Sequence, residues 1–501
     1  MLPKKKVFIT TPIFYLNDRP HLGHAYTLVV TDIIVRYKKS RGCVVSVQTG
    51  SDEHGEKILN TAKKKELQPL ELVEQNLFFF KELLIKINFS QNFFFRTSST
   101  QHWKKTQKKF KKLLDQGDIY LGQYKGEYCV VCEEYVTDNL SQCLNCQKPL
   151  ETLEEPAFFL RTTKYYSWLK DYYQQFDDFI IPKELKKSCL DNFLSENVRD
   201  LCLTRRNLPW GITLDGNLKL TIYVWFEALL NYINSSEGKK SFSNNETEII
   251  QVIGKDIVRF HCVYWPIILH LLKLRLPSRI IVHGWILNQK SKMSKSKGNV
   301  IDPLVLLNHY PTDLLRAYLI AKIPLFEDGS FNENHLKEFY QVFFVNKLGN
   351  LVVRVNRMVW LYNDGVIPCA IPSYQEKDVF LNDYFFSLQR TANQFVKFMD
   401  EQQLTKAFHL LEFLVSNSNK LINDMTPWKR IHTDKLLVDT FLNQIINGIR
   451  VLNFFLSFFI PESSLKISRV FSFSKIITNW DNFLELNDIE GLDVERDVSL
   501  F

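Results

Sequence analysis

Four closely spaced cysteines form the most specific chemical pattern in this sequence. Cys129 and Cys132 make one C-x-x-C pair, and Cys143 and Cys146 make a second pair after ten intervening residues. Each pair presents two thiolates from one tight turn, so two pairs complete a tetrahedral site of the kind that Zn²⁺ prefers. Because an all-cysteine set leaves no position for water or substrate, we expect one structural zinc ion per chain. The remaining cysteines lack such spacing and are expected in the core.

Two histidines and a lysine-rich stretch could act on phosphate groups. His21 and His24, in HLGH, stand at the expected start of a helix, directly after the first predicted strand. The amides and dipole of a helix N-terminus favour an anion. Far along the chain, KSKMSKSKGN (290–299) supplies lysines that could serve as point charges for phosphate oxygens. Taken alone, helix-capping histidines and a solvated loop are the ordinary interpretations.

A strand, a helix and a second strand are predicted at the start of the chain. KKKVFITTPIFY (4–15) is rich in β-branched and aromatic residues, 21–42 is a helix with a basic last turn, and CVVSVQTG (43–50) is the second strand. A βαβ unit implies a parallel sheet, whose ligands bind beyond the carboxyl ends of its strands. We therefore expect residues 15–24 and 49–57 to share one rim.

The sheet is expected to resume after an insertion. Residues 61–115 are predicted to be helical, and the six lysines between Lys104 and Lys112 are interpreted as a solvated face. From Asp118 the sequence changes to short segments with glycines and cysteines, typical of a small inserted domain. Strand-like sequence then returns at 220–229, 248–257 and 278–287. Beyond residue 335, apolar residues at helical spacing over 404–424 and 434–460 predict a helical bundle.

Length and composition indicate the number of domains, the kind of partner and the cellular compartment. A chain of 501 residues is too long for one ordinary core, and its formal net charge of +8 suits a polyanionic partner. Strand-like sequence from Val7 leaves no room for a targeting peptide, and the apolar run at 451–460 is too short to cross a bilayer. The cysteine pattern is not that of a disulfide framework. We expect a cytoplasmic protein that does not associate with membranes.

Together these motifs resemble a known family. HLGH is similar to the HIGH signature and KMSKS matches the second signature of class I aminoacyl-tRNA synthetases, in the same order on a split parallel sheet. The resemblance to methionyl-tRNA synthetases covers residues 5–430. It is carried by TTPIFYLNDRPHLGHAYT, TGSDEHGEKI, GKDIVRFHCVYWP and HGWILNQKSKMSKSKGNVIDP.

The expected fold class is α/β: a split parallel-sheet (Rossmann-like) catalytic domain with a zinc-bearing insertion, followed by an α-helical bundle. The predicted divisions are the first catalytic half (1–115), the connective insertion (116–210), the second catalytic half (211–300), a linking segment (301–345), a helical anticodon-binding domain (346–479) and an acidic C-terminal segment (480–501). The extra β-barrel module that some relatives append for tRNA binding is not seen.

The resemblance also assigns roles to particular residues. ATP binding falls to His21, His24, Asp256, Lys292 and Lys295, of which the histidines and lysines are also catalytic and Lys295 acts on the activation transition state. Methionine binding falls to Ile13, Tyr15, Asp52, Trp225, Ala228, Tyr232 and His261, with Asp52 receiving the ammonium group. Arg205 is expected to couple activation to transfer. Anticodon reading falls to Asn350, Arg354 and Trp428.

The implied reaction joins L-methionine to ATP, with Mg²⁺, and passes the methionyl group to tRNA(Met). Three alternatives use parts of the same pattern. A pantetheine-phosphate adenylyltransferase would need neither the lysine loop nor the cysteines. A cysteinyl-tRNA synthetase would use its zinc to contact substrate, with a histidine ligand. A non-catalytic RNA-binding protein would need neither the histidines nor the loop lysines.

Overall fold

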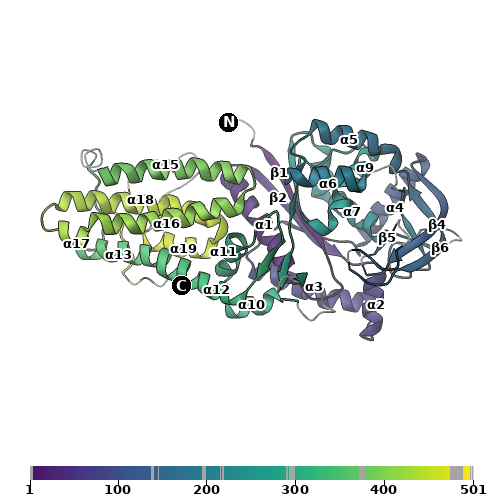
Figure 1. The fold of residues 1–501 in the computed structure, drawn as a ribbon, viewed down its shortest axis with the longest axis horizontal. Coiled ribbons are helices and arrows are strands. Elements are labelled where there is room, and N and C mark those ends of the chain that lie inside the picture. Colours follow the sequence, from purple (N-terminus) through teal and green to yellow (C-terminus); the bar gives the residue numbers. More distant parts are fainter. Residues whose placement is uncertain are drawn as a thin grey trace. The chain divides into compact units, whose positions relative to one another are not determined.

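The computed structural model describes residues 4–500 apart from 132, 137–139, 145, 195–198, 215, 217–218, 289–290, 293–299, 372–378, 474–488, 497 and 499. The predicted site residues Cys132 and Lys295 therefore lie outside the described residues. The chain divides into two compact units. Residues 1–31, 43–285 and 302–304 form the first, and residues 32–42, 286–301 and 305–501 form the second. The first unit holds the main sheet, and the second is dominated by long helices (Figure 1).

Six parallel strands form the sheet of the first unit, in the order β3-β2-β1-β11-β12-β7. Their bounds are β1 (Lys6–Tyr15), β2 (Val44–Asp52), β3 (Phe93–Arg96), β7 (Ile180–Ile181), β11 (Thr247–Gly254) and β12 (Arg279–His283). β1 lies between β2 and β11. Lys6 of β1 pairs with Val44 of β2 on one side and with Thr247 of β11 on the other. Val7, Phe8 and Ile9 are all buried, as expected for a parallel strand covered on both faces. The predicted split sheet is confirmed.

Helix α1 (Leu22–Ser40) follows β1 at the predicted place and ends with Lys38 and Lys39 in its last turn. The prediction of continuous helix over 61–115 is partly wrong. α2 (Glu56–Lys64), α3 (Pro69–Lys86) and α4 (Thr100–Asp115) occupy most of this region, but β3 lies between the last two helices. FFFR pairs with β2 at the sheet edge, a long-range contact that overrides the helical character of its neighbours.

The insertion forms an antiparallel sheet of order β5-β4-β6-β8, made of β4 (Ile119–Cys129), β5 (Glu134–Val136), β6 (Glu151–Leu160) and β8 (Leu201–Cys202). It also contains α5 (Tyr166–Gln175) and α6 (Lys183–Phe193). Strand β7 lies between these two helices in sequence, yet it pairs with β12 at the edge of the main sheet. The insertion therefore contributes a strand to the sheet that it interrupts. The finer domain boundaries proposed from sequence stay predictions.

The predicted strand over 220–229 is wrong for most of its length. β10 (Leu220–Ile222) pairs antiparallel with β9 (Thr204–Arg206), outside the main sheet, and helix α7 (Val224–Asn234) begins two residues later. Ten of its eleven residues are buried, including the polar Glu227, Asn231 and Asn234, so the helix has almost no face exposed to water. A short apolar segment buried all round cannot be separated from a buried strand by periodicity.

Two of the six lysines on α4 are partly buried and donate hydrogen bonds to Asn234. Lys105 Nζ donates to the main-chain oxygen of Asn234 at 2.6 Å, and Lys109 Nζ donates to its side-chain oxygen at 2.6 Å. Both cations thus lie at the carboxyl end of α7, where the helix dipole favours positive charge. Burial and neighbouring lysines lower the pKa of Lys109 to about 8.

The second unit contains α11 (Thr312–Lys322), α12 (Glu333–Phe339), α13 (Asn350–Asn363), α15 (Val379–Asp400), α16 (Leu404–Met425), α17 (Pro427–Arg430), α18 (Lys435–Phe459) and α19 (Pro461–Val470). The helices predicted over 404–424 and 434–460 are confirmed by α16 and α18. Within the unit, the fully buried Arg316 donates to Asp32 Oδ2 at 2.7 Å and to the last carbonyls of α18. Among the described residues, no helix is long and apolar enough to cross a membrane.

Candidate active site

The carboxyl ends of neighbouring parallel strands bring the predicted ligand-binding residues to one rim of the first unit. β1 ends at Tyr15, β2 ends at Asp52 and β11 ends at Gly254, followed by a short turn of 3₁₀ helix that contains Asp256. A register shift in β1 between Thr10 and Ile13 sets the pairing of its last residues with Gly50–Asp52. The two predicted segments of the rim thus meet in the structure.

His21 and His24 form a stacked pair at the start of α1. Their ring centroids are 3.8 Å apart, with 20° between the ring planes, and the main-chain N–H of His21 donates to His24 Nδ1 at 3.0 Å. Because Nδ1 accepts this bond, the proton of a neutral His24 ring lies on Nε2, which can then donate to an anion. Gly23 leaves room for the pair, since a Cβ there would come within 3.0 Å of the His21 ring.

The segment just before the histidines is tied to the segment that follows the lysine loop. Arg19 Nε donates to Asp302 Oδ2 at 2.9 Å, and both residues belong to the first unit. The backbone of Lys292 lies in β14 (Ser291–Lys292), which belongs to the second unit. The roles of Lys292 and Lys295 at phosphate groups stay predictions.

Asp52 is a buried carboxylate with no counter-ion among the described residues. Its Oδ1 atom has no hydrogen-bond partner among the described residues, and the side chain is 6% exposed. Burial, followed by the negative charges of Glu227, Glu133 and Glu53, raises the pKa of Asp52 well above its ordinary value, and the main-chain N–H of His54 opposes this rise. Such a carboxylate gains most from a ligand that brings its own positive charge, such as an ammonium group.

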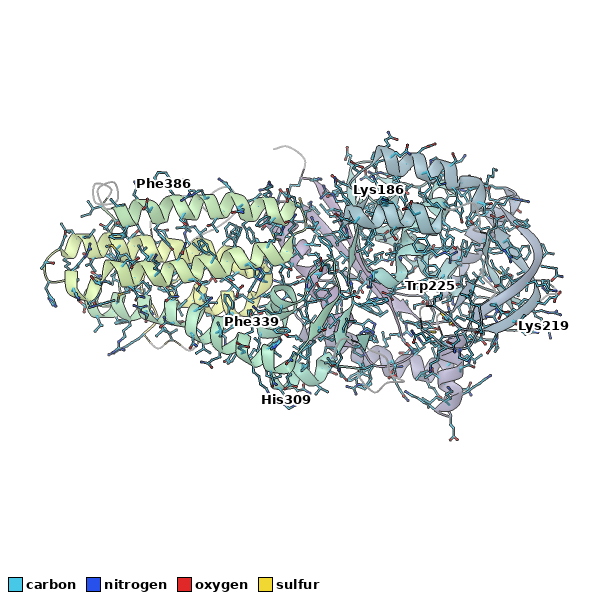
Figure 2. The ribbon with its side chains drawn as sticks, viewed as in Figure 1. Lys186, Lys219, Trp225, His309, Phe339 and Phe386 are labelled. Carbon is cyan, nitrogen blue, oxygen red and sulfur yellow. The ribbon has the colours of Figure 1, made fainter. Side chains whose placement is uncertain are left out.

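Aromatic residues line the neighbouring space. Tyr232, on α7, donates its hydroxyl hydrogen to His261 Nε2 at 2.8 Å, while His261 Nδ1 donates to the Ile257 carbonyl at 3.1 Å. Burial lowers the pKa of His261 to about 4, so this ring is neutral at physiological pH. Trp225 of α7, labelled in Figure 2, stacks on Phe260 with ring centroids 3.9 Å apart.

These contacts group neutral, polarisable rings, of which Tyr232 is close to Asp52. Burial and then the charge of Asp52 raise the pKa of Tyr232, consistent with their closeness. Ala228 is buried one helical turn before Tyr232, and the Ile13 side chain contacts the edge of β2 near Gly50. The predicted methionine-binding residues are therefore placed around one region. Their individual roles stay predictions.

Sequence reasoning missed Glu133, which joins the cysteine-bearing insertion to this region. Tyr15 donates its hydroxyl hydrogen to Glu133 Oε2 at 2.7 Å, and the Lys57 main-chain N–H at the start of α2 donates to Oε1 at 3.0 Å. Burial raises the pKa of Glu133 to about 7. Only its position next to Cys132 could have drawn attention to it, because sequence patterns do not mark a buried acid.

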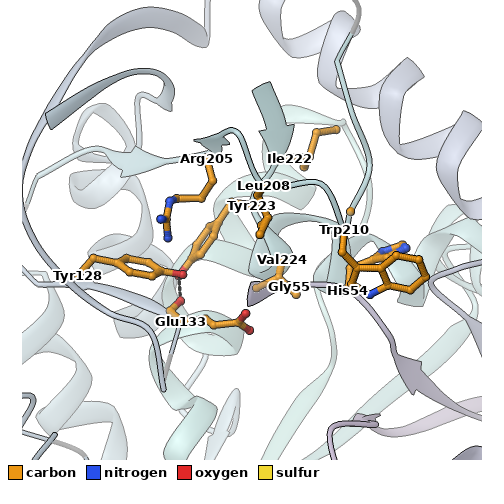
Figure 3. A pocket seen from close by; sticks show the side chains of 11 residues that line it. His54, Gly55, Tyr128, Glu133, Arg205, Leu208, Trp210, Ile222, Tyr223 and Val224 are labelled. Carbon is orange, nitrogen blue, oxygen red and sulfur yellow. Dashed lines mark hydrogen bonds between the residues drawn. The ribbon is translucent and has the colours of Figure 1, made fainter. Parts of the chain in front are cut away.

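Glu133 and Arg205 line a small pocket together with His54, Gly55 and Trp210 (Figure 3). Arg205 donates to Glu56 at 3.1 Å and to Glu155 at 3.2 Å, and its guanidinium lies 4.1 Å above the Tyr128 ring. These ion pairs hold the arginine at the junction of the insertion and the main sheet.

Three of the four predicted zinc ligands come together. One sulfur each from Cys129, Cys143 and Cys146 lies within 4.8 Å of the others, and Sγ of Cys129 is 3.5 Å from Sγ of Cys146. A disulfide requires roughly 2.05 Å, whereas sulfurs about 2.3 Å from a tetrahedral Zn²⁺ lie roughly 3.8 Å apart. The cluster therefore fits a metal ion. The fourth predicted ligand, Cys132, lies outside the described residues.

The predicted anticodon-reading residues lie in the second unit. Asn350 and Arg354 are one turn apart on α13 and donate to Asn419 Oδ1 at 3.0 Å and Asn423 Oδ1 at 2.8 Å, one turn apart on α16. Trp428, on α17, is 46% exposed and so is not a core residue of this unit. Sequence analysis did not single out the two supporting asparagines.

Comparisons with known proteins agree with this geometry. Residues 7–356 match the family model described as tRNA synthetases class I (M). The chain is 37% identical to a methionine--tRNA ligase of Ureaplasma parvum, over 99% of this chain and 96% of that protein, and 37% identical to one of Clostridium perfringens, over 97% and 76%. A structure of Mycobacterium tuberculosis methionyl-tRNA synthetase in complex with methionyl-adenylate superposes with a TM-score of 0.90 at 27% identity, covering 99% of both chains.

The parallel sheet with its histidine pair and buried rim carboxylate is thus the catalytic unit of a class I tRNA synthetase. Within that class, this chain belongs to the methionine–tRNA ligase family.

The unbalanced charge at Asp52 predicts a stabilising substitution. Asp52→Asn should raise the melting temperature at pH 8, because it removes a buried carboxylate whose pKa is raised. A carboxyl group whose pKa is higher in the folded protein than in the unfolded protein destabilises the folded protein when it is ionised. The advantage of the variant should therefore grow as the pH rises above the unfolded pKa, about 4, and level off above the raised value.

Glu53 provides the matched control. It is adjacent and equally buried, but both of its oxygens accept from Arg96, at 2.8 and 3.0 Å. Glu53→Gln should lower the melting temperature, since it breaks a paired buried charge. Thermal unfolding followed by circular dichroism between pH 5 and 9 measures both effects. A lower melting temperature for Asp52→Asn at pH 8 would show that Asp52 is already balanced by a positive charge.

Proposed function

We propose that this protein activates L-methionine with ATP to give methionyl-adenylate and pyrophosphate, and then transfers the methionyl group to tRNA(Met). The observation that carries the proposal is the buried, uncompensated Asp52 carboxylate beside a neutral aromatic lining, at the ligand rim of a chain in this family. The carboxylate suits the ammonium group of an amino acid, and the polarisable rings of Trp225 and Tyr232 suit a thioether. Because the reaction serves translation, we place it in the cytoplasm.

In the first step, the carboxylate of methionine attacks the α-phosphorus of ATP and pyrophosphate leaves. Asp52 orients the amino acid, and His24 Nε2–H, with His21 stacked against it, donates to phosphate oxygens. Asp256 completes the nucleotide site at the end of β11. Lys292 and Lys295 stabilise the charge that develops on the phosphates. Mg²⁺ bound to ATP would neutralise part of that charge.

In the second step, a hydroxyl of the terminal adenosine of tRNA attacks the carbonyl carbon, and AMP leaves. Arg205 is placed to couple the two steps, because its ion pairs with Glu56 and Glu155 join the rim to the insertion. Asn350, Arg354 and Trp428 offer hydrogen-bonding edges and an aromatic face to unstacked anticodon bases.

Pyrophosphate exchange with each of the twenty amino acids tests the function. Methionine should give the fastest exchange, and cysteine, the substrate of the nearest alternative, should give almost none. Lys295→Ala should slow adenylate formation by on the order of 2–4 kcal/mol of activation free energy with little change in methionine affinity, since its charge acts on the transition state. Lys297→Ala in the same loop is the control. Exchange that is fastest with cysteine, or absent with every amino acid, would refute the proposal.

We further propose that the cysteine cluster holds one structural Zn²⁺ through Cys129, Cys132, Cys143 and Cys146. Cys143→Ser should lose most of the bound zinc and unfold the insertion at lower temperature, because metal binding stabilises the folded site. Elemental analysis and thermal unfolding measure both. Cys202→Ser, a buried cysteine without the spacing, should keep its zinc. Freshly purified wild-type protein without metal would contradict the assignment.

Trp428 is predicted to stack on an anticodon base. Trp428→Ala should leave pyrophosphate exchange nearly intact while aminoacylation of tRNA with a CAU anticodon loses about 1–3 kcal/mol of stacking. Trp360 of α13 is a contrasting tryptophan, since its Nε1–H donates to the Glu495 carbonyl at 3.1 Å and it packs within the unit. Trp360→Ala should mainly lower the melting temperature. A parallel loss of stability and exchange in Trp428→Ala would assign Trp428 to packing instead.

A further inference from the structure

A buried carboxylate–histidine pair adjoins Asp52 of the proposed amino-acid site. Glu227 on α7 is fully buried, and its two carboxylate oxygens lie 2.9 and 3.0 Å from Nδ1 of His54. His54 follows Asp52 by two residues and is 1% exposed. Burial raises the pKa of Glu227, but the attractions and hydrogen bonds of His54 and His102 together outweigh it and leave the pKa lowered, so the carboxylate is ionised. The reaction steps described above use neither residue.

The acceptor side of this pair is rigidly held. Nε2 of His102 lies 3.7 Å from Oε2 of Glu227. Nδ2 of Asn234 lies 3.1 Å from Nδ1 of His102 and donates to Thr106 Oγ1 at 3.0 Å. Asn234 in turn receives Lys109. A polar network between α7 and α4 therefore holds the Glu227 carboxylate in place. The carboxylate in turn fixes the orientation of the His54 ring.

The His54 side chain, the donor of this pair, is also held by its neighbours. His54 lies between two tryptophans, with its ring centroid 5.6 Å from Trp103 and 5.4 Å from Trp210. The main-chain N–H of His54 donates to the Asp52 carboxylate, and its Nδ1–H faces Glu227. Nε2 is buried without a hydrogen-bond partner among the described residues, and the residue lines the pocket of Figure 3. One residue thus connects Asp52, at the end of β2, to α7.

We propose that His54, held by Glu227, is a positioning residue for the substrate ammonium group. Helix α7 carries the thioether-binding candidates Trp225 and Tyr232, whereas Asp52 belongs to β2. The Glu227–His54 bond keeps the two parts at a constant separation, so only an amino acid whose ammonium group and side-chain end match that separation satisfies both. This inference rests on the proposed function, and it adds a residue that sets methionine affinity and selectivity without touching the substrate.

Three substitutions of His54 separate its two ring nitrogens. Asn places a donor near the position of Nδ1 and keeps the bond to Glu227. Gln places its amide near Nε2 and loses that bond, and Leu keeps volume without either group. Loss of a buried charge-assisted hydrogen bond should raise the KM for methionine roughly tenfold or more in His54→Leu and His54→Gln. His54→Asn should recover most of that affinity.

The measurements are pyrophosphate exchange at varied methionine and ATP, methionine affinity by tryptophan fluorescence, and thermal unfolding. We expect the methionine KM to rise with little change in kcat or the KM for ATP, and the preference for methionine over leucine to fall. Glu227→Gln, which keeps an acceptor but removes the charge, should produce a smaller rise and serves if the His54 variants fold poorly. His270→Gln is the control, an exposed histidine stacked on Trp168 at 4.0 Å.

The outcomes separate this inference from the proposed function. Recovery by His54→Gln but not by His54→Asn would mean that Nε2 contacts the substrate, and would overturn the positioning role. If the wild-type protein catalyses exchange with methionine and all His54 and Glu227 variants keep the wild-type KM for methionine, the inference is overturned and the proposed function stands. Wild-type protein that activates no methionine would overturn the proposed function and the inference with it.

Discussion

The pairing of β1 with β2 on one side and β11 on the other is the constraint on which the catalytic unit depends. These strands comprise residues 6–15, 44–52 and 247–254. The centre of the sheet is therefore complete only when β11 pairs with β1, nearly two hundred residues after the end of β2. Parallel pairing puts all three carboxyl ends on one rim. The histidine pair, Asp52 and Asp256 reach the same region for this reason, because each follows or ends one of these strands. The register shift in β1 adjusts Ile13 and Tyr15 against the end of β2.

Around this rim, buried charges fall into two groups. Glu53 is paired with Arg96, and Glu227 with His54 and His102. Each pair compensates the desolvation of its carboxylate and stabilises the fold. Asp52 lies near the negative charges of Glu53 and Glu227 and has no such partner among the described residues, and its raised pKa reflects that. The site thus stores an unfavourable interaction that a substrate ammonium group can relieve, which links binding affinity to the stability of the unliganded protein.

Side-chain contacts between segments far apart in sequence join the cysteine-bearing insertion to the rim of the main sheet, and join α13 to α16 in the second unit. Glu133 connects the turn that carries the cysteine cluster to Tyr15 and to the start of α2, and Arg205 connects the insertion to Glu56 on the same helix. In the second unit, two asparagines on α16 hold the exposed edges of α13 at Asn350 and Arg354. In each case a side chain outside the predicted site fixes the orientation of one within it.

The sequence by itself determined what depends on local pattern. The βαβ unit from β1 to β2, the long apolar helices α16 and α18 and the cysteine pairs could be read from spacing, because neighbouring residues set hydrophobic periodicity and ligand geometry. The two signature motifs were identified by their resemblance to a family. The tertiary structure decided what depends on partners far along the chain. β3 and β7 are strands because each pairs at an edge of the sheet, and α7 is a helix although its buried residues resemble a strand. Lys105 and Lys109 cap α7 instead of facing solvent, and Glu133, Glu227 and His54 gain their roles from burial. The free energy of a buried charge is set by what surrounds it in space, and no spacing in the sequence reports that.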